Sequence, residues 1–235
     1  VNYWMPDGYK DTCADTKIHR DLMTQSLDEI FSAMKKSEDV IYSLESKLFG
    51  VGVESYTVAS HEYSYGYAVK NDLAYTLDAG HFHPTEVISA KLTACLQFLD
   101  KVALHISRGV RWDSDHVVTW DDELQNIMDE IIHNNFEKRV FIGLDFFDAS
   151  INRIACWAIG MRNARKALLS ACLAPADAIR TAEQEYDYTS RLALMEERKT
   201  LPFGAIWDYY CLKNDVGVGS EWLAKVKEYE KDVLS

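Results

Sequence analysis

Metal-binding or ionisable residues follow four short apolar runs of this sequence. The runs are Val40–Lys47, Leu73–His81, Val102–Arg108 and Val140–Asp148. Each run is predicted to be a buried strand, because it is short, apolar and followed by a helix-length segment. Side chains at the carboxyl ends of successive parallel strands lie at one face of an α/β sheet or barrel. We therefore expect five residues to meet in space: Glu45, Asp78, His81, His105 and Asp145.

The expected cluster has the composition of a site for divalent cations. Carboxylates combined with one or two imidazoles suit Mn²⁺, Mg²⁺ or Co²⁺ better than a structural thiolate zinc site. The ligands suffice for two cations, which would polarise or position substrate oxygens. The sequence has no glycine-rich phosphate loop, no GxSxG motif and no basic stripe. These absences argue against phosphorylated substrates, serine hydrolysis and nucleic acids.

The densest single candidate is the loop RWDSDH, residues 111–116. Its acidic pair, Asp113 and Asp115, places two carboxylates close enough to share one hard cation. Taken alone, such a pair is more typical of a solvated turn. The strand-end pattern elsewhere in the chain favours the interpretation as a cation site.

The strand-end residues also have structural interpretations when each is considered alone. Asp78 and His81 could cap the helix that Pro84 is expected to open. Glu45 and Lys47 point the same way along a strand end and could form a plain salt bridge.

A lone histidine in an apolar strand, such as His105, is more often a satisfied core residue than a ligand. A carboxylate at the mouth of a buried strand needs a partner, and either a cation or Arg153 could serve Asp145. Four successive strands each end in a candidate ligand, however, and this joint pattern favours a metal site.

Composition restricts the class of protein. The chain has 235 residues, 48% of them hydrophobic and 26% charged, which is typical of soluble globular proteins. A formal net charge of -12 argues against a nucleic-acid partner or an anionic membrane. We find no bilayer-length apolar run and no signal peptide at the start. Five cysteines without a CxxC pair indicate reduced thiols, so we expect the protein in the cytoplasm.

The predicted elements alternate between strand and helix up to about residue 151. A short strand is expected at Asn2–Met5, and the helices at 15–34, 53–70, 85–98 and from Asp121 onward. The remaining chain is predicted to be helical, at Ile151–Leu173, Ala176–Lys199, Leu201–Leu212 and Ser220–Leu234. This order indicates a parallel sheet over residues 1–151 and an all-helical extension over 152–235, packed on the first part or on a neighbouring subunit.

Several long stretches resemble the L-rhamnose isomerase family. They are VNYWMPDG, ESKLFGVGVESYTV, LDAGHFHPTEVIS, RWDSDHVV, IGLDFFDASINRIA and GSEWL, and they are spread over the whole chain. The resemblance implies a (β/α)₈ TIM-type barrel related to xylose isomerase, of which this chain supplies about five βα units and a helical tail. It also implies two divalent metals, a homotetramer and L-rhamnose as substrate. Because family members are longer, we expect this chain to be their carboxyl-terminal part.

The resemblance also implies roles for individual residues. The structural metal would be bound by Glu45, Asp78, His105 and Asp145, and the catalytic metal by His81, Asp113 and Asp115. Catalysis would involve Lys47, which contacts substrate, with Asp113, Asp115 and Asp145. Mn²⁺ is the expected cation, and Zn²⁺, Co²⁺ or Mg²⁺ also fit the structural position.

The implied reaction is the interconversion of L-rhamnose and L-rhamnulose. A hydride would move between adjacent carbons while Lys47 stabilises charge on the carbonyl oxygen, and an enediol route with a carboxylate base is the alternative. Two other functions stay open. One is an isomerase or epimerase of a related deoxy sugar, and the other is an incomplete barrel that binds divalent metal without turnover.

Overall fold

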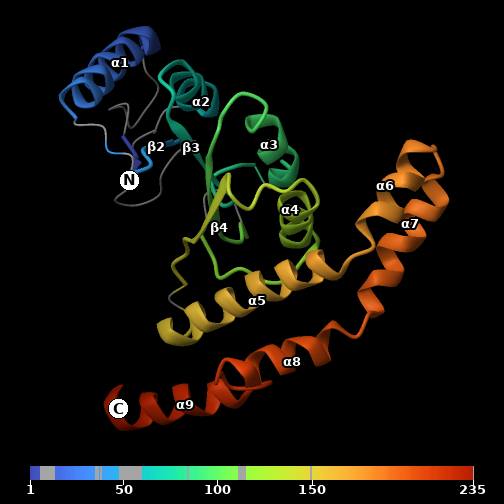
Figure 1. Cartoon of the computed structure of the whole chain (residues 1–235). Helices are drawn as coiled ribbons and strands as arrows, with labels where there is room; N and C mark the ends of the chain where they lie inside the picture. Colours follow the sequence, from blue (N-terminus) through green and yellow to red (C-terminus); the bar gives the residue numbers. More distant parts are fainter. Residues whose placement is uncertain are drawn as a thin grey trace. The chain divides into compact units, whose positions relative to one another are not determined.

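The computed structural model describes residues 1–5, 14–34, 37, 39–47, 60–83, 85–110, 115–148 and 150–234. Over these residues the chain has an α/β fold with one five-stranded sheet and nine α-helices (Figure 1). It divides into two compact units, Val1–Val118 with Glu137–Phe147 and Thr119–Phe136 with Asp148–Ser235. The predicted α/β class is confirmed, whereas barrel closure and the boundary at residue 151 stay predictions.

All five strands of the first unit are parallel and follow one another in chain order. They are β1 (Asn2–Tyr3), β2 (Ser43–Glu45), β3 (Ala74–Asp78), β4 (Val102–Ile106) and β5 (Val140–Leu144). Since neighbours in sequence are neighbours in the sheet, all the strand ends lie along one edge. The register sets Asp78 opposite His105 on adjacent strands. The parallel arrangement expected from the strand–helix alternation is therefore confirmed.

The core of the first unit lies around β3 and β4. Every residue of β3 is buried, and Tyr75, Leu77 and Leu104 are fully enclosed. Parallel strands covered on both faces are expected to be apolar along their whole length. Helix α2 (His61–Lys70) contacts β2 and β3, and helix α3 (Ile88–Cys95) buries one apolar face.

Helix α1 (Thr16–Ala33) confirms the predicted helix at 15–34, and Asp15 caps its first turn. Its contacts with α2 explain the tyrosines there: Tyr67 donates a hydrogen bond to Asp28, and the Tyr63 hydroxyl bonds to Thr24. Of the predicted helix at 53–70, residues 53–59 lie outside the described residues.

Helix α3 begins at Ile88, so the predicted start at Thr85 is wrong by three residues. The preceding segment forms a turn, because Glu86 N–H donates to the carbonyl of His83 and Thr85 N–H donates to the His83 ring. These bonds hold Thr85 and Glu86 in a turn before the helix begins. Pro84 lies outside the described residues.

The second unit is helical in its described residues. It contains α4 (Asp122–His133), α5 (Arg153–Leu173), α6 (Ala176–Gln184), α7 (Tyr188–Glu197), a 3₁₀ turn (Arg198–Thr200), α8 (Phe203–Lys213), α9 (Glu221–Tyr229) and a π turn (Glu230–Leu234). Small residues of α5, including Ala167, allow α4 to pack closely, and the Gln125 side chain donates to the Ala167 carbonyl. None of the described helices combines the length and apolar character that a bilayer span requires.

The single helix predicted at Ala176–Lys199 is wrong, because the chain breaks between α6 and α7. Tyr186 adopts a left-handed backbone conformation with φ of 60°, which ends α6. Asp187 then caps α7 by accepting a hydrogen bond from the backbone of Ser190.

Candidate metal centre

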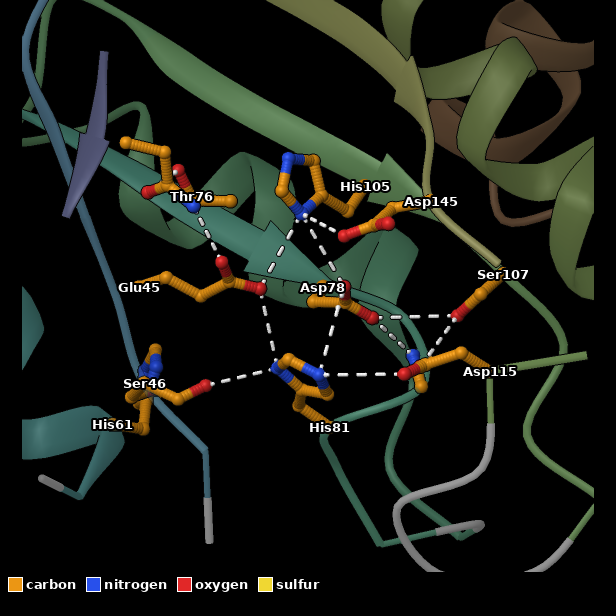
Figure 2. Close-up of polar contacts among 12 residues, drawn as sticks. Glu45, Ser46, His61, Thr76, Asp78, His81, His105, Ser107, Asp115 and Asp145 are labelled. Atoms are coloured by element: carbon orange, nitrogen blue, oxygen red, sulfur yellow. Dashed lines mark hydrogen bonds and ion pairs between the residues drawn. The ribbon is translucent and has the colours of Figure 1, made fainter. Parts of the chain in front are cut away.

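Four candidate ligands come from four neighbouring strands of the first unit. Glu45 and Asp78 are the last residues of β2 and β3, and His105 lies one residue before the end of β4. Asp145 directly follows β5, and its N–H continues the ladder by donating to the Ile106 carbonyl. Figure 2 shows the four side chains pointing toward one another from these strand ends.

We call Glu45, Asp78, His105 and Asp145 the first metal group. Nδ1 of His105 lies 3.3 Å from Oε1 of Glu45 and 3.3 Å from Oδ2 of Asp78. It lies 3.2 Å from Oδ2 of Asp145. One ligand atom from each residue falls within 4.8 Å of all the others. The arrangement predicted from the strand ends is therefore present in the structure.

Three atoms of this group are buried without a hydrogen-bond partner: Glu45 Oε1, Asp78 Oδ2 and His105 Nδ1. Leaving one such atom unsatisfied costs about 1–3 kcal/mol. Their neighbouring oxygens are occupied, since Asn2 donates to Glu45 Oε2 and the N–H of Gly80 donates to Asp78 Oδ1 at 2.7 Å. The donor set thus fits a divalent cation, which would satisfy all three atoms at once.

A second metal group consists of Asp78, His81 and Asp115. Nε2 of His81 lies 3.7 Å from Oδ2 of Asp78 and 3.8 Å from Oδ2 of Asp115. The other ring nitrogen, Nδ1, is hydrogen-bonded to the backbone carbonyl of Ser46 at 3.2 Å and also lies 3.2 Å from Oε1 of Glu45. An N–H donated to that carbonyl leaves Nε2 with a lone pair for a cation. Asp78 belongs to both groups.

Asp115 is positioned by its backbone. Its carbonyl accepts a hydrogen bond from Phe147, and the adjacent His116 pairs with Arg108 in a short antiparallel bridge. The hydroxyl of Ser107 lies 3.3 Å from Asp78 Oδ1 and 3.4 Å from Asp115 Oδ1, so it bridges two carboxylates of the second group. Ser107 was not predicted, because a serine after a strand carries no distinctive signal.

Two further predicted residues remain. Asp113 lies outside the described residues. Lys47 lies two residues beyond Glu45, is only 4% exposed, and has its Nζ 6.0 Å from the centre of the Trp4 ring. Its position two residues after Glu45 puts its side chain at the same end of the sheet as the metal groups.

The cluster is electrostatically coupled. Burial alone would lower the pKa of the His105 ring, but the contacts with Asp145, Asp78 and Glu45 raise that pKa to about 12. The pKa of His81 is likewise raised to about 10 by Asp115 and Glu45 against the effect of burial. Burial raises the pKa of Asp78 to about 6. Without a cation, the imidazolium rings therefore compensate part of the carboxylate charge.

Mn²⁺ binding should release protons from these two rings. Their raised pKa values stabilise the metal-free protein fully below pH 6.5, and this contribution is lost as the pH rises through about 10 for His81 and about 12 for His105. Near pH 7.5 each ring must therefore lose a proton to bind, and affinity should rise about tenfold per pH unit for each proton released. Calorimetry in buffers of different ionisation enthalpy measures the number of protons released. Binding heats that do not depend on the buffer would contradict the predicted proton release.

Gly80 makes room for Asp115. A Cβ atom at position 80 would lie 2.6 Å from the Ser107 hydroxyl and would overlap the Asp115 carboxylate. Gly80→Ala should therefore displace both side chains. It should lower the affinity of the second group for Mn²⁺ by about 10- to 100-fold, the usual effect of disturbing the residues around a metal ligand. Titration with Mn²⁺ followed by electron paramagnetic resonance measures both affinities.

The matched control for Gly80→Ala is Gly66→Ala. A Cβ added at Gly66, in α2, meets no atom within 4 Å. The control should keep both affinities, and equal binding by the two variants would contradict the role assigned to Gly80.

The whole chain, residues 1–235, matches the family model described as L-rhamnose isomerase (RhaA). It is 56% identical over 234 residues to L-rhamnose isomerase of Rhodopirellula baltica, covering 100% of this chain and 55% of that protein. It is 55% identical over 235 residues to the enzymes of Yersinia pestis strain Pestoides F and Yersinia pseudotuberculosis strain IP 31758, covering 56% of each. The chain thus spans about half the length of these curated relatives.

Proposed function

Because the chain belongs to the L-rhamnose isomerase family, we propose that it carries the metal centre of an enzyme that interconverts L-rhamnose and L-rhamnulose. The observation that carries the proposal is the set of three buried ligand atoms at the strand ends that face one another and make no hydrogen bond. The family membership supports the choice of substrate, and the carboxylate–imidazole donor set supports divalent metal.

We assign the first group to one cation and the second group, with Asp113, to another. Bound divalent cations would hold and polarise neighbouring hydroxyl and carbonyl oxygens of the open-chain sugar. Mn²⁺ is the cation we propose, and Zn²⁺, Co²⁺ or Mg²⁺ also suit the carboxylate-rich first group. The shared ligand Asp78 would hold the two cations close together.

The protein's own groups have distinct tasks in this proposal. Asp113 and Asp115 would take up the proton of the sugar hydroxyl through one water molecule. The buried ammonium of Lys47 would stabilise negative charge that develops on the carbonyl oxygen. Asp145, whose side chain is 63% exposed, would orient the sugar from the open side of the first group.

Transfer between the two carbons is proposed as a hydride shift, with an enediol route as the alternative. Reaction in D₂O separates them. A hydride shift leaves the transferred hydrogen on carbon, whereas a carboxylate base that removes it as a proton exchanges it for deuterium. Carbon-bound deuterium in the product would therefore favour the enediol route.

Lys47→Met should lower kcat by about 10²- to 10³-fold, the usual effect of losing one group that stabilises developing charge. Mn²⁺ binding should not weaken, because no ligand is removed. Lys166→Met is the control, since Lys166 likewise lies over a tryptophan, with its Nζ 5.6 Å from the centre of the Trp207 ring in the second unit. Steady-state kinetics with L-rhamnose gives the result, and equal kcat in both variants would remove Lys47 from the mechanism.

The proposed function is tested by conversion of L-rhamnose to L-rhamnulose after chelator treatment and after Mn²⁺ is restored. The assay should use this chain and a chain extended to the length of its relatives. Mn²⁺-dependent turnover by the extended chain supports the proposal. Metal binding without turnover in either chain would favour a binding protein, and turnover of another deoxy sugar alone would favour a related isomerase or epimerase.

The homotetramer and the cytoplasmic location that were expected from the sequence stay predictions. The expected lack of nucleic-acid and membrane partners also stays a prediction.

A further inference from the structure

We propose that His61 is a positioning residue for the second metal group, because it supports the end of β2 through Tyr75 and Ser46 and the His81 loop through Phe82. The inference rests on the metal centre proposed above. His61 contacts none of the candidate ligands in the described residues, so its effect would be transmitted through these three neighbours.

The first link runs behind the sheet. Ser46 lies between Glu45 and Lys47, so its side chain points away from the face that carries the metal groups. The Ser46 hydroxyl is 2.6 Å from the hydroxyl of Tyr75, which is fully buried on β3. The same Tyr75 hydroxyl is 2.9 Å from Nδ1 of His61, the first residue of α2. A continuous hydrogen-bonded chain therefore joins the start of α2 to the end of β2.

The hydrogen-bonded series from His61 through Tyr75 to Ser46 has a defined protonation pattern. Burial lowers the pKa of His61, so its ring is neutral and has one donor and one acceptor nitrogen. Burial also raises the pKa of Tyr75, so its phenol keeps the proton and can donate one bond while accepting the other. Both ends of the chain are thus satisfied without a charge behind the sheet.

Ser46 connects this series of hydrogen bonds to the second metal group. Its backbone carbonyl accepts the hydrogen bond from Nδ1 of His81, which leaves Nε2 facing Asp78 and Asp115 (Figure 2). Ser46 is therefore held at its hydroxyl and in turn orients the His81 ring. Displacement of this residue would also move Glu45 and Lys47, its neighbours in the chain.

A second link uses ring contacts. The His61 and Phe82 rings pack in a T-shaped arrangement with centroids 5.4 Å apart, and Phe82 directly follows His81. The His61 ring also stacks on Tyr65, with centroids 5.6 Å apart. The ring is therefore held within α2 and braces the loop that presents His81. Two independent contacts of one residue converge on the same ligand.

The test compares Tyr75→Phe with Tyr63→Phe. Each substitution removes one hydroxyl. The Tyr75 hydroxyl bonds to Ser46 and His61, whereas the Tyr63 hydroxyl bonds to Thr24 of α1. Tyr75→Phe should weaken Mn²⁺ binding at the second group by about tenfold, in the range of disturbed outer-shell partners. It should also change the visible absorption spectrum of the Co²⁺-loaded protein, which reports ligand geometry and not stability. Tyr63→Phe should leave affinity and spectrum unchanged, and equal behaviour of the two variants would overturn the inference.

His61→Phe and His61→Asn provide a second pair, at a residue that is only partly buried. His61→Phe keeps the ring contacts and loses the bond to Tyr75, whereas His61→Asn loses the ring and keeps an amide near Nδ1. Each variant should lower the affinity of the second group for Mn²⁺, and an unchanged affinity in both variants would overturn the inference. These measurements use only Mn²⁺ and Co²⁺, with the chain extended to the length of its relatives. They are therefore independent of whether L-rhamnose is the substrate.

Discussion

Substituting asparagine for Asp78 should abolish Mn²⁺ binding at both metal groups at once. Asp78 is the one residue that belongs to both groups, and its Oδ2 is buried without a hydrogen-bond partner in the described part of the chain. Disturbing an outer-shell partner already weakens metal binding by about 10- to 100-fold. Removing a shared ligand should therefore weaken both affinities by more than ~100-fold, and turnover should fall below detection.

The same substitution should not unfold the protein. Burial raises the pKa of Asp78 to about 6, so above that pH the charged carboxylate destabilises the metal-free state. The neutral amide removes this cost, and His105 keeps Glu45 and Asp145 as partners. We therefore expect the metal-free variant to be no less stable than the metal-free wild type at pH 8.

Thermal unfolding with and without Mn²⁺ separates the two effects. At one hundred times its dissociation constant, a bound ligand stabilises the folded protein by about 2.7 kcal/mol per site. The wild type should show this shift and Asp78→Asn should not. Asp28→Asn is the control, because Asp28 accepts a hydrogen bond from Tyr67 and lies in neither metal group. A Mn²⁺-dependent shift in Asp78→Asn equal to that of the control would contradict the shared role.

The double substitution of Asp113 and Asp115 by asparagine should abolish turnover but leave one cation bound. Asp115 belongs to the second group, and the first group contains neither residue. Loss of groups that hold and move the reacting proton costs about 10²- to 10⁴-fold in rate. Since the second cation would be lost as well, we expect the upper end of this range or beyond.

Mn²⁺ stoichiometry checks this prediction together with the rate. The double variant should bind one Mn²⁺ where the wild type binds two. A charge-matched control replaces Asp122 and Asp177, whose side chains are 92% and 100% exposed, by asparagine. It should keep two cations and normal turnover. Near-normal turnover in the Asp113 and Asp115 variant would remove the second group from the mechanism.

The strand-end residues could be predicted from the sequence for a simple physical reason. Parallel strands that follow one another in the sheet bring their carboxyl ends to one edge, so Glu45, Asp78, His105 and Asp145 had to lie near one another. The sequence could not show that Asp78 is shared between two groups. That depends on the directions of individual carboxylate oxygens, which follow from the hydrogen bonds of Gly80 and Ser107.

Other features depended on local competition that periodicity does not record. The break after α6 arises because Tyr186 takes a left-handed conformation and Asp187 begins a new helix. The late start of α3 coincides with a turn in which the N–H groups of Thr85 and Glu86 bond to His83. The role proposed for His61 required knowing that Ser46 and Tyr75 meet behind the sheet, 29 residues apart in sequence.

The most direct test of the two-metal centre is anomalous X-ray scattering at the manganese edge. It would use crystals, grown with Mn²⁺, of the chain extended to the length of its relatives. The account predicts two peaks. One should lie among Glu45, Asp78, His105 and Asp145, and the other should be bonded to Nε2 of His81 and to Asp115. A map with no peak within bonding distance of both Glu45 and Asp78 would contradict the proposed centre.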